Sequence, residues 1–168
     1  NISMVRLLSD RVFIVGQALF PGSYTLSSFS TLINALFAAG GPSKSGTMRE
    51  IQVKRNGATV THFDLYDFLL KGDKTKDIRL MPEDVIFIPP VGSLVGLVGN
   101  VKIPAIYELK EKASLLDLFA MAGGLTPIAF KGRVQLQRVQ DHHLTTLFES
   151  DLIDMGENPK KDFLLSDG

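Results

Sequence analysis

The sequence predicts an α+β protein built from two tandem copies of one small domain. The first observation is an internal repeat, in which Gly16 aligns with Gly99 at an offset of 83 residues. Of the 42 aligned positions from Ile14 to Arg55, 11 are identical. The second observation is that each copy follows the order strand, strand, helix, strand, strand, strand. This period indicates two homologous folded units, because solenoid repeats are shorter, roughly 20–50 residues.

Two β-hairpins are predicted in the first copy. Val12–Gln17 is a short run of residues that favour strands, and Ser23–Leu26 is the returning strand. Arg49–Arg55 alternates polar and apolar residues, and Ala58–Phe63 follows it. The dipeptide Asn56-Gly57 between them is a strong signal for a two-residue hairpin turn.

Two helical segments are predicted in the same copy. Ser30 or Thr31 caps the first of them. Its buried face is expected to consist of the apolar residues Leu32, Ile33, Leu36, Phe37, Ala38 and Ala39. Gly40-Gly41 ends this helix, since glycine accepts the left-handed conformation at a helix end. A short helical turn over Asp64–Leu70 is capped by Asp64 and ends near Gly72.

A buried strand, Asp84–Pro90, closes the first copy. The second copy is expected to follow the same course, with strands at Leu97–Asn100, Ile106–Leu109, Gly132–Val139 and His143–Phe148 and a helix at Ser114–Ala122. A hairpin, one helix across it and further strands within about 80 residues is the order of the ubiquitin-like β-grasp. The expected fold class is therefore two tandem β-grasp domains, each a mixed sheet with one main helix.

The register of the repeat also divides the chain. We expect residues 1–10 to be the closing strand of a preceding repeat plus a linker, residues 11–91 to be the first repeat, and residues 92–168 to be the second repeat, lacking its last strand. At the same offset, Asn1–Val5 aligns with Asp84–Ile88. Since a missing inner strand exposes unpaired edges, we expect Ile2–Leu8, of this chain or of a neighbouring copy, to fill the vacant position.

Composition excludes several functional classes. Lys and Arg total 18, as do Asp and Glu, so no net charge favours nucleic acid or an anionic membrane surface. The absence of Cys removes disulfides, thiolate metal sites and cysteine nucleophiles. No apolar run approaches the roughly 20 residues that span a bilayer. The chain starts at Asn1 without a signal peptide, which predicts that it is excised from a longer protein.

Both copies carry the pattern V-G, then P-G, then Y-x-L, then a helix ending A-G-G and a strand ending in arginine. In the first copy the pattern is Val15-Gly16, Pro21-Gly22, Tyr24, Leu26, Ala39-Gly40-Gly41 and Arg55. In the second it is Val98-Gly99, Pro104, Tyr107, Leu109, Ala122-Gly123-Gly124 and Arg138. This pattern resembles the soluble-ligand-binding β-grasp (SLBB) domain. The chain departs from it at Ala105, which stands where the first copy has Gly22, and at Glu83, where the family's closing motif has glycine.

The resemblance implies tandem SLBB domains of a bacterial outer-membrane polysaccharide export protein. Such domains are periplasmic and form rings with other copies, and capsular polysaccharide or exopolysaccharide passes through the rings. The expected location is the periplasm, with attachment to the outer membrane through parts absent from this chain. The implied partners are polysaccharide, further copies of the chain and an inner-membrane polysaccharide co-polymerase. No cofactor, metal or catalytic residue is expected.

Two alternative functions remain open from the residues. One is a receptor for a small soluble ligand, cobalamin-like or an oligosaccharide, which a deep pocket between helix and loops would favour. The other is a hydrolase, which requires two carboxyl groups roughly 5–10 Å apart in a cleft. No pair of acids recurs between the copies, so the hydrolase ranks last.

Six polar residues at equivalent positions are candidates for ligand binding: Gln17, Tyr24, Arg55, Asn100, Tyr107 and Arg138. The two arginines offer a planar fork of donors to sugar hydroxyls or carboxylates. The two tyrosines could stack on sugar rings. Gln17 and Asn100 sit at equivalent hairpin tips, where they would face a neighbour or a lumen. The structural alternatives are a strand-end salt bridge for arginine, sheet packing for tyrosine and turn formation for the amides.

Other polar groups favour ordinary structural roles. His142-His143 is interpreted as an exposed hairpin pair, because adjacent strand residues point to opposite faces. Gly40-Gly41 follows a helix, whereas anion sites lie where a helix begins. Asp64, Asp67 and Asp73 fit no calcium loop and are interpreted as solvated loop charges.

Overall fold

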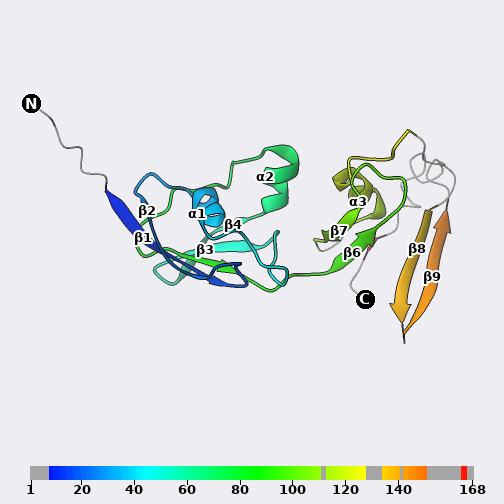
Figure 1. Cartoon of the computed structure of the whole chain (residues 1–168), viewed down its shortest axis with the longest axis horizontal. Coiled ribbons are helices and arrows are strands. Elements are labelled where there is room, and N and C mark those ends of the chain that lie inside the picture. Colours follow the sequence, from blue (N-terminus) through cyan, green and yellow to red (C-terminus); the bar gives the residue numbers. More distant parts are fainter. Residues whose placement is uncertain (1–7, 111–112, 128–133, 141, 151–163, 166–168) are drawn as a thin grey trace, which may run out of the picture. The chain divides into compact units, whose positions relative to one another are not determined.

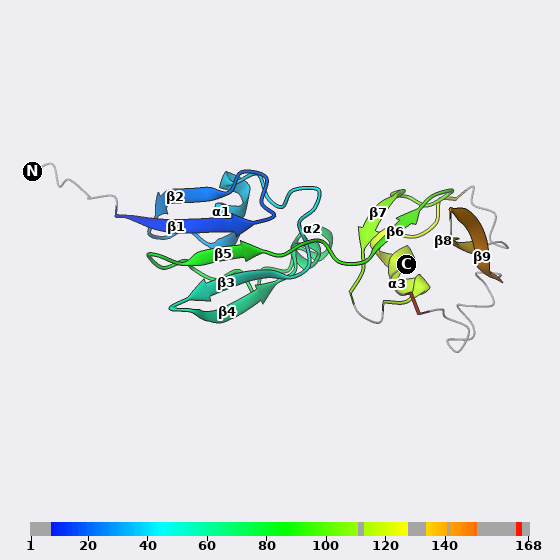
Figure 2. The ribbon, with the colours of Figure 1, turned by 90° about the horizontal axis from the view of Figure 1, so that it is seen from below.

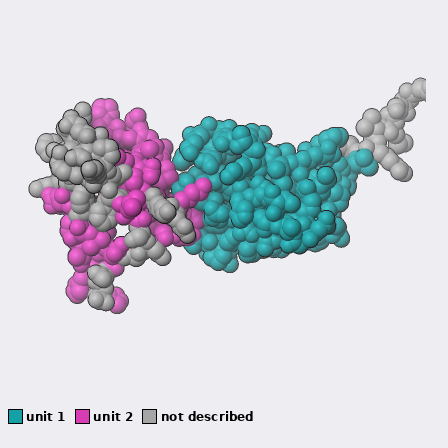
Figure 3. Space-filling model, turned by 180° about the vertical axis from the view of Figure 1, so that it is seen from behind, with its two compact units in different colours: residues 1–91 teal, residues 92–168 magenta. Residues whose placement is uncertain are grey.

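The computed structural model describes residues 8–110, 113–127, 134–140, 142–150 and 164–165. The chain divides into two compact units, Asn1–Val91 and Gly92–Gly168, which are named unit 1 and unit 2 (Figure 1, Figure 3). Within the described residues, no helix is long and apolar enough to cross a membrane.

Unit 1 contains one five-stranded sheet with the order β2-β1-β5-β3-β4 (Figure 2). Its strands are β1 (Ser9–Gly16), β2 (Gly22–Ser27), β3 (Ile51–Arg55), β4 (Ala58–Phe63) and β5 (Val85–Ile88). The closing strand β5 runs parallel to β1 and antiparallel to β3, so it lies in the sheet interior as predicted. This mixed sheet with a helix on one face confirms the predicted fold class.

The first strand begins earlier than the sequence indicated. Ser9 pairs with Ser27 and Asp10 pairs with Leu26, so both residues of β1 belong to the sheet. The predicted strand begins at Val12, three residues later than the start of β1 at Ser9. Strand pairing with β2 extends the strand here, although neither Ser9 nor Asp10 favours a strand by itself.

The helices of unit 1 begin and end at locally encoded caps. Helix α1 spans Leu32–Ala38, and its N-cap is Thr31 rather than Ser30. The backbone N–H of Thr31 donates to the side-chain oxygen of Asn34 at 2.9 Å. Helix α2 spans Leu65–Lys71, and its N-cap Asp64 accepts from the backbone N–H of Tyr66 at 2.9 Å. Gly72 ends α2 in the left-handed conformation, as predicted.

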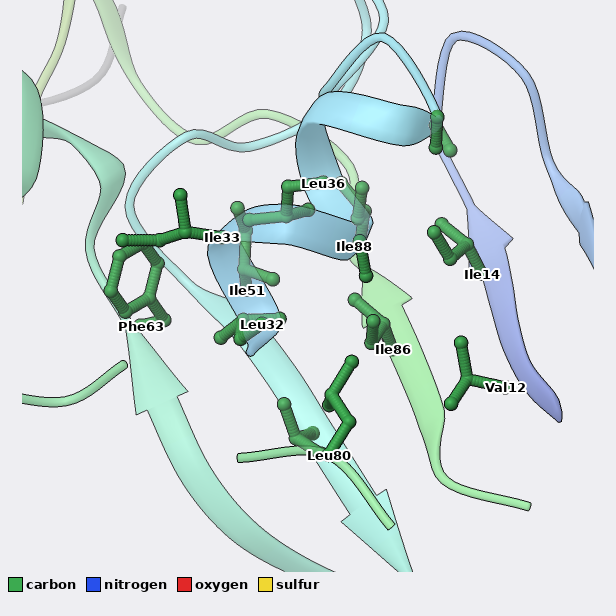
Figure 4. Close-up of a cluster of buried hydrophobic side chains, with 14 of the residues drawn as sticks. Val12, Ile14, Leu32, Ile33, Leu36, Ile51, Phe63, Leu80, Ile86 and Ile88 are labelled. Carbon is green, nitrogen blue, oxygen red and sulfur yellow. The ribbon is translucent and has the colours of Figure 1, made fainter. Parts of the chain in front are cut away.

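Helix α1 covers one face of the sheet and forms the core with it (Figure 4). The labelled core side chains are Val12, Ile14, Leu32, Ile33, Leu36, Ile51, Phe63, Leu80, Ile86 and Ile88. The prediction that Phe37 and Ala38 share the buried face is wrong: both are exposed, and Phe37 keeps 62% of its surface. Each residue of an α-helix is rotated by about 100° from the one before it. Phe37 and Ala38, which follow the buried Leu36, therefore point away from the sheet.

Unit 2 repeats this order of elements. It contains β6 (Leu94–Leu97), β7 (Ala105–Glu108), α3 (Leu115–Met121), β8 (Val134–Gln140) and β9 (His143–Ser150). The predicted strand Leu97–Asn100 is wrong in its bounds, because the pairing of β6 with β7 ends where Leu97 meets Ala105. Gly99 has φ of +109° and belongs to the turn. Ser114 caps α3 and exchanges hydrogen bonds with Asp117, which matches the predicted helix start.

The sheets of the two units differ in their centre. In unit 2 the described strands form two separate hairpins, β6-β7 and β8-β9. The hairpins nevertheless keep the register of unit 1: the irregularity between Val53 and Lys54 recurs between Leu136 and Gln137. The described part of unit 2 thus contains both hairpins of the β-grasp sheet but no strand at the position that β5 occupies in unit 1. Residues 2–7 of the segment expected to fill this position, Ile2–Leu8, lie outside the described residues.

Candidate functional site

The two candidate tyrosines hold the hairpin turns of their units. The hydroxyl of Tyr24 donates to the carbonyl of Phe20 at 2.6 Å, and that of Tyr107 donates to the carbonyl of Ile103 at 2.7 Å. Both bonds span four residues and close the turn before the returning strand. Tyr107 is buried, whereas Tyr24 is half-buried. The hydroxyl of each tyrosine is therefore hydrogen-bonded within its own hairpin. We call each of these tyrosine hydrogen bonds a turn latch.

The candidate amides Gln17 and Asn100 tie the hairpin to the loop that follows the helix. The carbonyl of Gln17 accepts from the N–H of Ser43 at 2.8 Å, and the carbonyl of Asn100 accepts from the N–H of Thr126 at 2.9 Å. The side-chain oxygen of Gln17 also accepts from the Ser45 hydroxyl at 2.8 Å. Both side chains are exposed, so they remain reachable from solvent at equivalent places.

Arg55 closes a bidentate ion pair with Asp84. Its Nε donates to Oδ1 at 2.8 Å and its Nη2 donates to Oδ2 at 2.7 Å. The Asp84 side chain is fully buried and also accepts from the N–H of Met81. The hydrogen bond to Asp84 raises the pKa of Arg55 above its ordinary value. This pair clamps the end of β3 to the start of β5. Arg138, at the equivalent place on β8, is half-buried.

The structure does not gather these six residues into one site. Within each unit the tyrosine lies on a hairpin, the amide lies at the turn before it, and the arginine lies on another strand. Five of the six residues, Gln17, Tyr24, Arg55, Asn100 and Tyr107, make contacts that hold the backbone of their own unit. A role of the six residues in ligand binding stays a prediction.

A metal site would require several acidic or histidine side chains close together. No group of three or more His, Asp or Glu could hold a metal ion in the described part of the chain. Asp64, Asp67 and Asp73 border a hollow of about 10 Å³, which has room for about one water. His142, in a positive-φ turn, and His143 are both exposed at the β8–β9 hairpin.

Each of those three carboxylates also has a partner of its own. Asp64 accepts from Arg49 at 3.2 Å, and Asp67 accepts from the Lys71 ammonium at 2.8 Å. Asp73 accepts from the N–H of Thr75, and this hydrogen bond lowers the pKa of Asp73. Each of the three carboxylates is therefore held by a cationic side chain or a backbone N–H.

A hollow that could accept another group lies beside α1 in unit 1. This cavity has a volume of about 300 Å³, and we name it the α1 pocket. Its lining consists of Ile33, Leu36, Phe37, Gly40, Gly41, Pro42, Met48 and Leu65. Every lining side chain is apolar, so the pocket suits an aliphatic or aromatic group better than a sugar.

Exposed rings and aliphatic groups surround the α1 pocket. Phe37 lies 6.3 Å from Phe68, centroid to centroid, with the two rings tilted. At the hairpin tip, a Cβ added to Gly40 would approach Leu19 and Phe20, so both side chains lie over the end of α1. Leu19 is 50% exposed and Phe20 is 64% exposed. Exposed apolar side chains thus lie next to the α1 pocket.

Sequence reasoning missed this pocket because it assigned Phe37 to the core. A usable signal was present in the repeat, since Leu19 aligns with Lys102 and Phe37 aligns with Ala120. An apolar residue that its homologous unit replaces by lysine or alanine is not required by the fold. Such positions are candidates for contacts outside the domain.

Comparison with known proteins identifies both units. Residues 10–88 match one family model for the SLBB domain, and residues 94–144 match another. Two curated relatives, each named polysialic acid transport protein KpsD, come from Escherichia coli. Each is 29% identical over 112 residues, which is 66% of this chain and 20% of the relative. The chain thus corresponds to about a fifth of the length of these relatives.

Proposed function

Because this chain belongs to the SLBB domain family, we propose that it is a structural and binding module of a channel that exports capsular polysaccharide or exopolysaccharide. Copies of the module assemble into a ring in the periplasm, and polysaccharide passes through that ring. Attachment to the outer membrane is made by parts of the protein outside these 168 residues. The module holds and guides the polymer and performs no chemistry on it.

The observation that carries this proposal is the pairing of two SLBB domains with relatives that are named for polysaccharide transport. The polar residues that recur in both units support it further. Tyr24 and Tyr107 lock the turns, and Arg55 locks the sheet to β5, so they build a rigid frame. A rigid repeated frame suits a ring wall, because a wall requires defined geometry more than reactive groups.

The proposed partners follow from this role. They are the polysaccharide, further copies of the chain and an inner-membrane polysaccharide co-polymerase that delivers the polymer. The equal numbers of acidic and basic residues offer no reason to include nucleic acid.

The α1 pocket favours a second candidate, a receptor for a small ligand. Its volume of about 300 Å³ lies at the lower end of the range for ligand sites. A sugar or a cobalamin-like ligand also needs polar groups that fix its orientation, and the lining side chains supply none. The receptor hypothesis is therefore restricted to a compact apolar ligand.

Titration with polysaccharides tests the proposed function directly. We would add size-fractionated polysialic acid, a neutral capsular polysaccharide and a compact apolar probe such as indole separately to isotope-labelled protein and follow the backbone amide signals. The expected result is a contiguous set of shifted amides with at least one polysaccharide and no release of new reducing ends. Shifts around Phe37 and Met48 with the apolar probe, and none with either polymer, would contradict the export module and favour the receptor.

A further inference from the structure

We propose that the α1 pocket of one copy receives the outer face of the β6–β7 hairpin of a second copy. This inference rests on the proposed function, because it supplies the contact by which copies would join. We name the second surface the β6–β7 face, and it consists of Leu94, Val98 and Ile106. The contact is heterologous, since it joins two different surfaces.

The residues of the β6–β7 face point away from the core of unit 2. Gly96 pairs with Ile106, and Leu94 precedes Gly96 by two residues, so Leu94 and Ile106 share one face of the hairpin. Tyr107, the neighbour of Ile106, lies on the opposite, buried face. Ile106 is 69% exposed, and Val98, directly after β6, is 85% exposed. These three exposed aliphatic groups lie on one short hairpin, as Val139, Leu144 and Leu147 do on the β8–β9 hairpin.

The side chain of Ile106 projects as a knob. Its cross-strand partner is a glycine, and a Cβ added at Gly96 would meet no atom within 4 Å. No side chain therefore stands directly opposite Ile106 on β6. The α1 pocket offers a complementary hollow, and its volume of about 300 Å³ is ample for aliphatic side chains.

The equivalent face of the sheet in unit 1 carries cationic side chains over its aromatic rings. Arg11 stands at the position of Leu94, and its guanidinium lies 5.3 Å from the centroid of the Phe13 ring. Lys54 lies 5.0 Å from the centroid of Phe87 on the same face. Cationic side chains thus cover the apolar groups of unit 1 and give that face a polar surface. The corresponding positions of unit 2, Leu94 and Ile106, carry exposed aliphatic side chains.

The exchange of character between the units is reciprocal. Around the α1 pocket, Leu19 and Phe37 of unit 1 correspond to Lys102 and Ala120 of unit 2. On the sheet face, Leu94 and Ile106 of unit 2 correspond to Arg11 and Ser23 of unit 1. At these four pairs of positions, one unit has a large apolar side chain where its homologue has a polar or small one, whereas Phe20 and Val98 correspond to the apolar residues Ile103 and Val15. This pattern favours a contact from unit 2 of one copy to unit 1 of the next.

A heterologous contact of this kind has a defined consequence for assembly. After every addition the growing assembly keeps one free pocket at one end and one free face at the other, so copies add head to tail. Such a chain closes into a ring when the rotation between copies permits it. A contact between the α1 pockets of two copies, by contrast, would use the same surface on both copies and would stop at a dimer.

Two double variants that exchange residues between the units test the contact. The pocket variant Leu19→Lys/Phe37→Ala gives unit 1 the residues of unit 2, and the face variant Leu94→Arg/Ile106→Ser gives unit 2 the residues of unit 1. Because each residue already occurs at the equivalent place in the sister unit, both variants should fold, which circular dichroism checks. Leu144→Ser removes an exposed leucine outside both surfaces and is the matched control.

Sedimentation velocity over a concentration series measures the assembly. We expect the unchanged chain and the Leu144→Ser control to form species larger than a dimer, and each double variant alone to remain monomeric. An equal mixture of the two variants should form a heterodimer and stop there, because it contains a single intact pocket and a single intact face per pair. No other arrangement of these two surfaces gives that result.

Three outcomes would overturn the proposed contact. The unchanged chain could remain monomeric at every concentration, the face variant could self-associate as a pocket-to-pocket dimer, or both variants could assemble like the control. Polysaccharide titration of the same samples separates this failure from failure of the proposed function. Retained polysaccharide binding with any of these outcomes would reject only the contact, whereas loss of binding by the unchanged chain would reject the export module.

Discussion

Unit 1 and unit 2 share their hairpins, helix caps and turn latches, but they differ in the centre of the sheet. In unit 1, β5 joins the β1-β2 hairpin to the β3-β4 hairpin. Among the described residues of unit 2, the corresponding hairpins remain two separate sheets. The strand register and the cap of α3 still match those of unit 1. Local elements of this domain therefore form from local signals, and the central strand is what unites them.

The inward-facing residues of the third strand are more buried in unit 1 than in unit 2. In unit 1 the inward residues Ile51 and Val53 of β3 are fully buried beside β5. Their equivalents in unit 2, Val134 and Leu136, are only half-buried. Since apolar burial supplies most of the stability of a small domain, unit 2 should be the less stable unit.

The largest effect is expected at the open position in unit 2. We propose that residues 2–7 of the predicted segment Ile2–Leu8, from the same chain or from a neighbouring copy, take the place in unit 2 that β5 takes in unit 1. Removal of residues 1–7 should then abolish hydrogen-exchange protection at the amides of β6 and β8 that face this position, because their ladder partners are lost. Leu8 is kept because its carbonyl accepts from the N–H of Ser28. Unchanged protection in β6 and β8 would contradict the proposal.

The next effect concerns the central strand of unit 1. Ile86→Ala removes a fully buried side chain from β5 and should lower the free energy of unfolding of unit 1 by about 4 kcal/mol, within the range for buried large-to-small changes. Ile106→Ala, at an exposed position of unit 2, should change stability by less than about 0.5 kcal/mol. Urea unfolding followed by hydrogen exchange in each unit measures both. Equal losses in the two variants would show that burial does not distinguish these positions.

A smaller loss is expected from Arg55→Met. The variant leaves the fully buried Asp84 carboxylate without its arginine, although the N–H of Met81 still donates to it. We expect unit 1 to lose about 2–3 kcal/mol. The raised pKa of Arg55 means that its contribution is complete below the ordinary arginine pKa and is lost only as the pH rises above it. The difference between variant and parent should accordingly be constant through neutral pH, in denaturant titrations at several pH values.

Arg138→Met is the matched variant in unit 2. Its cost should be smaller, because β8 pairs with β9 alone among the described strands. A loss as large as that of Arg55→Met would indicate that unit 2 contains an equivalent buried carboxylate clamp.

The smallest effects are expected when the tyrosine hydroxyls of the two turn latches are removed. Tyr24→Phe and Tyr107→Phe each remove one hydroxyl hydrogen bond and keep the ring. Each should cost about 0.5–1.5 kcal/mol, and the buried Tyr107 should cost more than the half-buried Tyr24. Thermal unfolding of both variants decides the order. The reverse order would mean that the latch contributes independently of burial.

Turns and caps were predictable because their signals are local. Asn56-Gly57 forms the predicted turn with positive φ at both residues, and Asp64 and Gly72 begin and end α2 as expected. Each of these depends on the conformational preference of one or two residues and on hydrogen bonds to near neighbours. The repeat at an offset of 83 residues strengthens these predictions, because the same weak turn and cap signals occur in both copies.

The candidate site was less predictable because its chemistry depends on distant neighbours. Arg55 was recognised as notable, but its partner Asp84 lies 29 residues away and was not identified. Phe37 was assigned to the core, since periodicity over a seven-residue helix does not distinguish the rim from the buried face. The strand at Leu97–Asn100 was misplaced because its end is set by pairing with β7. In each case the missing quantity was a contact that the local sequence does not specify.

The sequence by itself determined the duplication, the β-grasp order of elements and the residues that begin and end them, since these depend on short-range preferences repeated in register. Only the tertiary structure decided which recurring polar residues serve the scaffold and where an apolar pocket opens beside α1. It also decided that the hairpins of unit 2 stand apart among the described residues. The physical reason is that ladder partners, burial and ion pairs are made between segments far apart in the chain, and no local preference encodes which segment will be there.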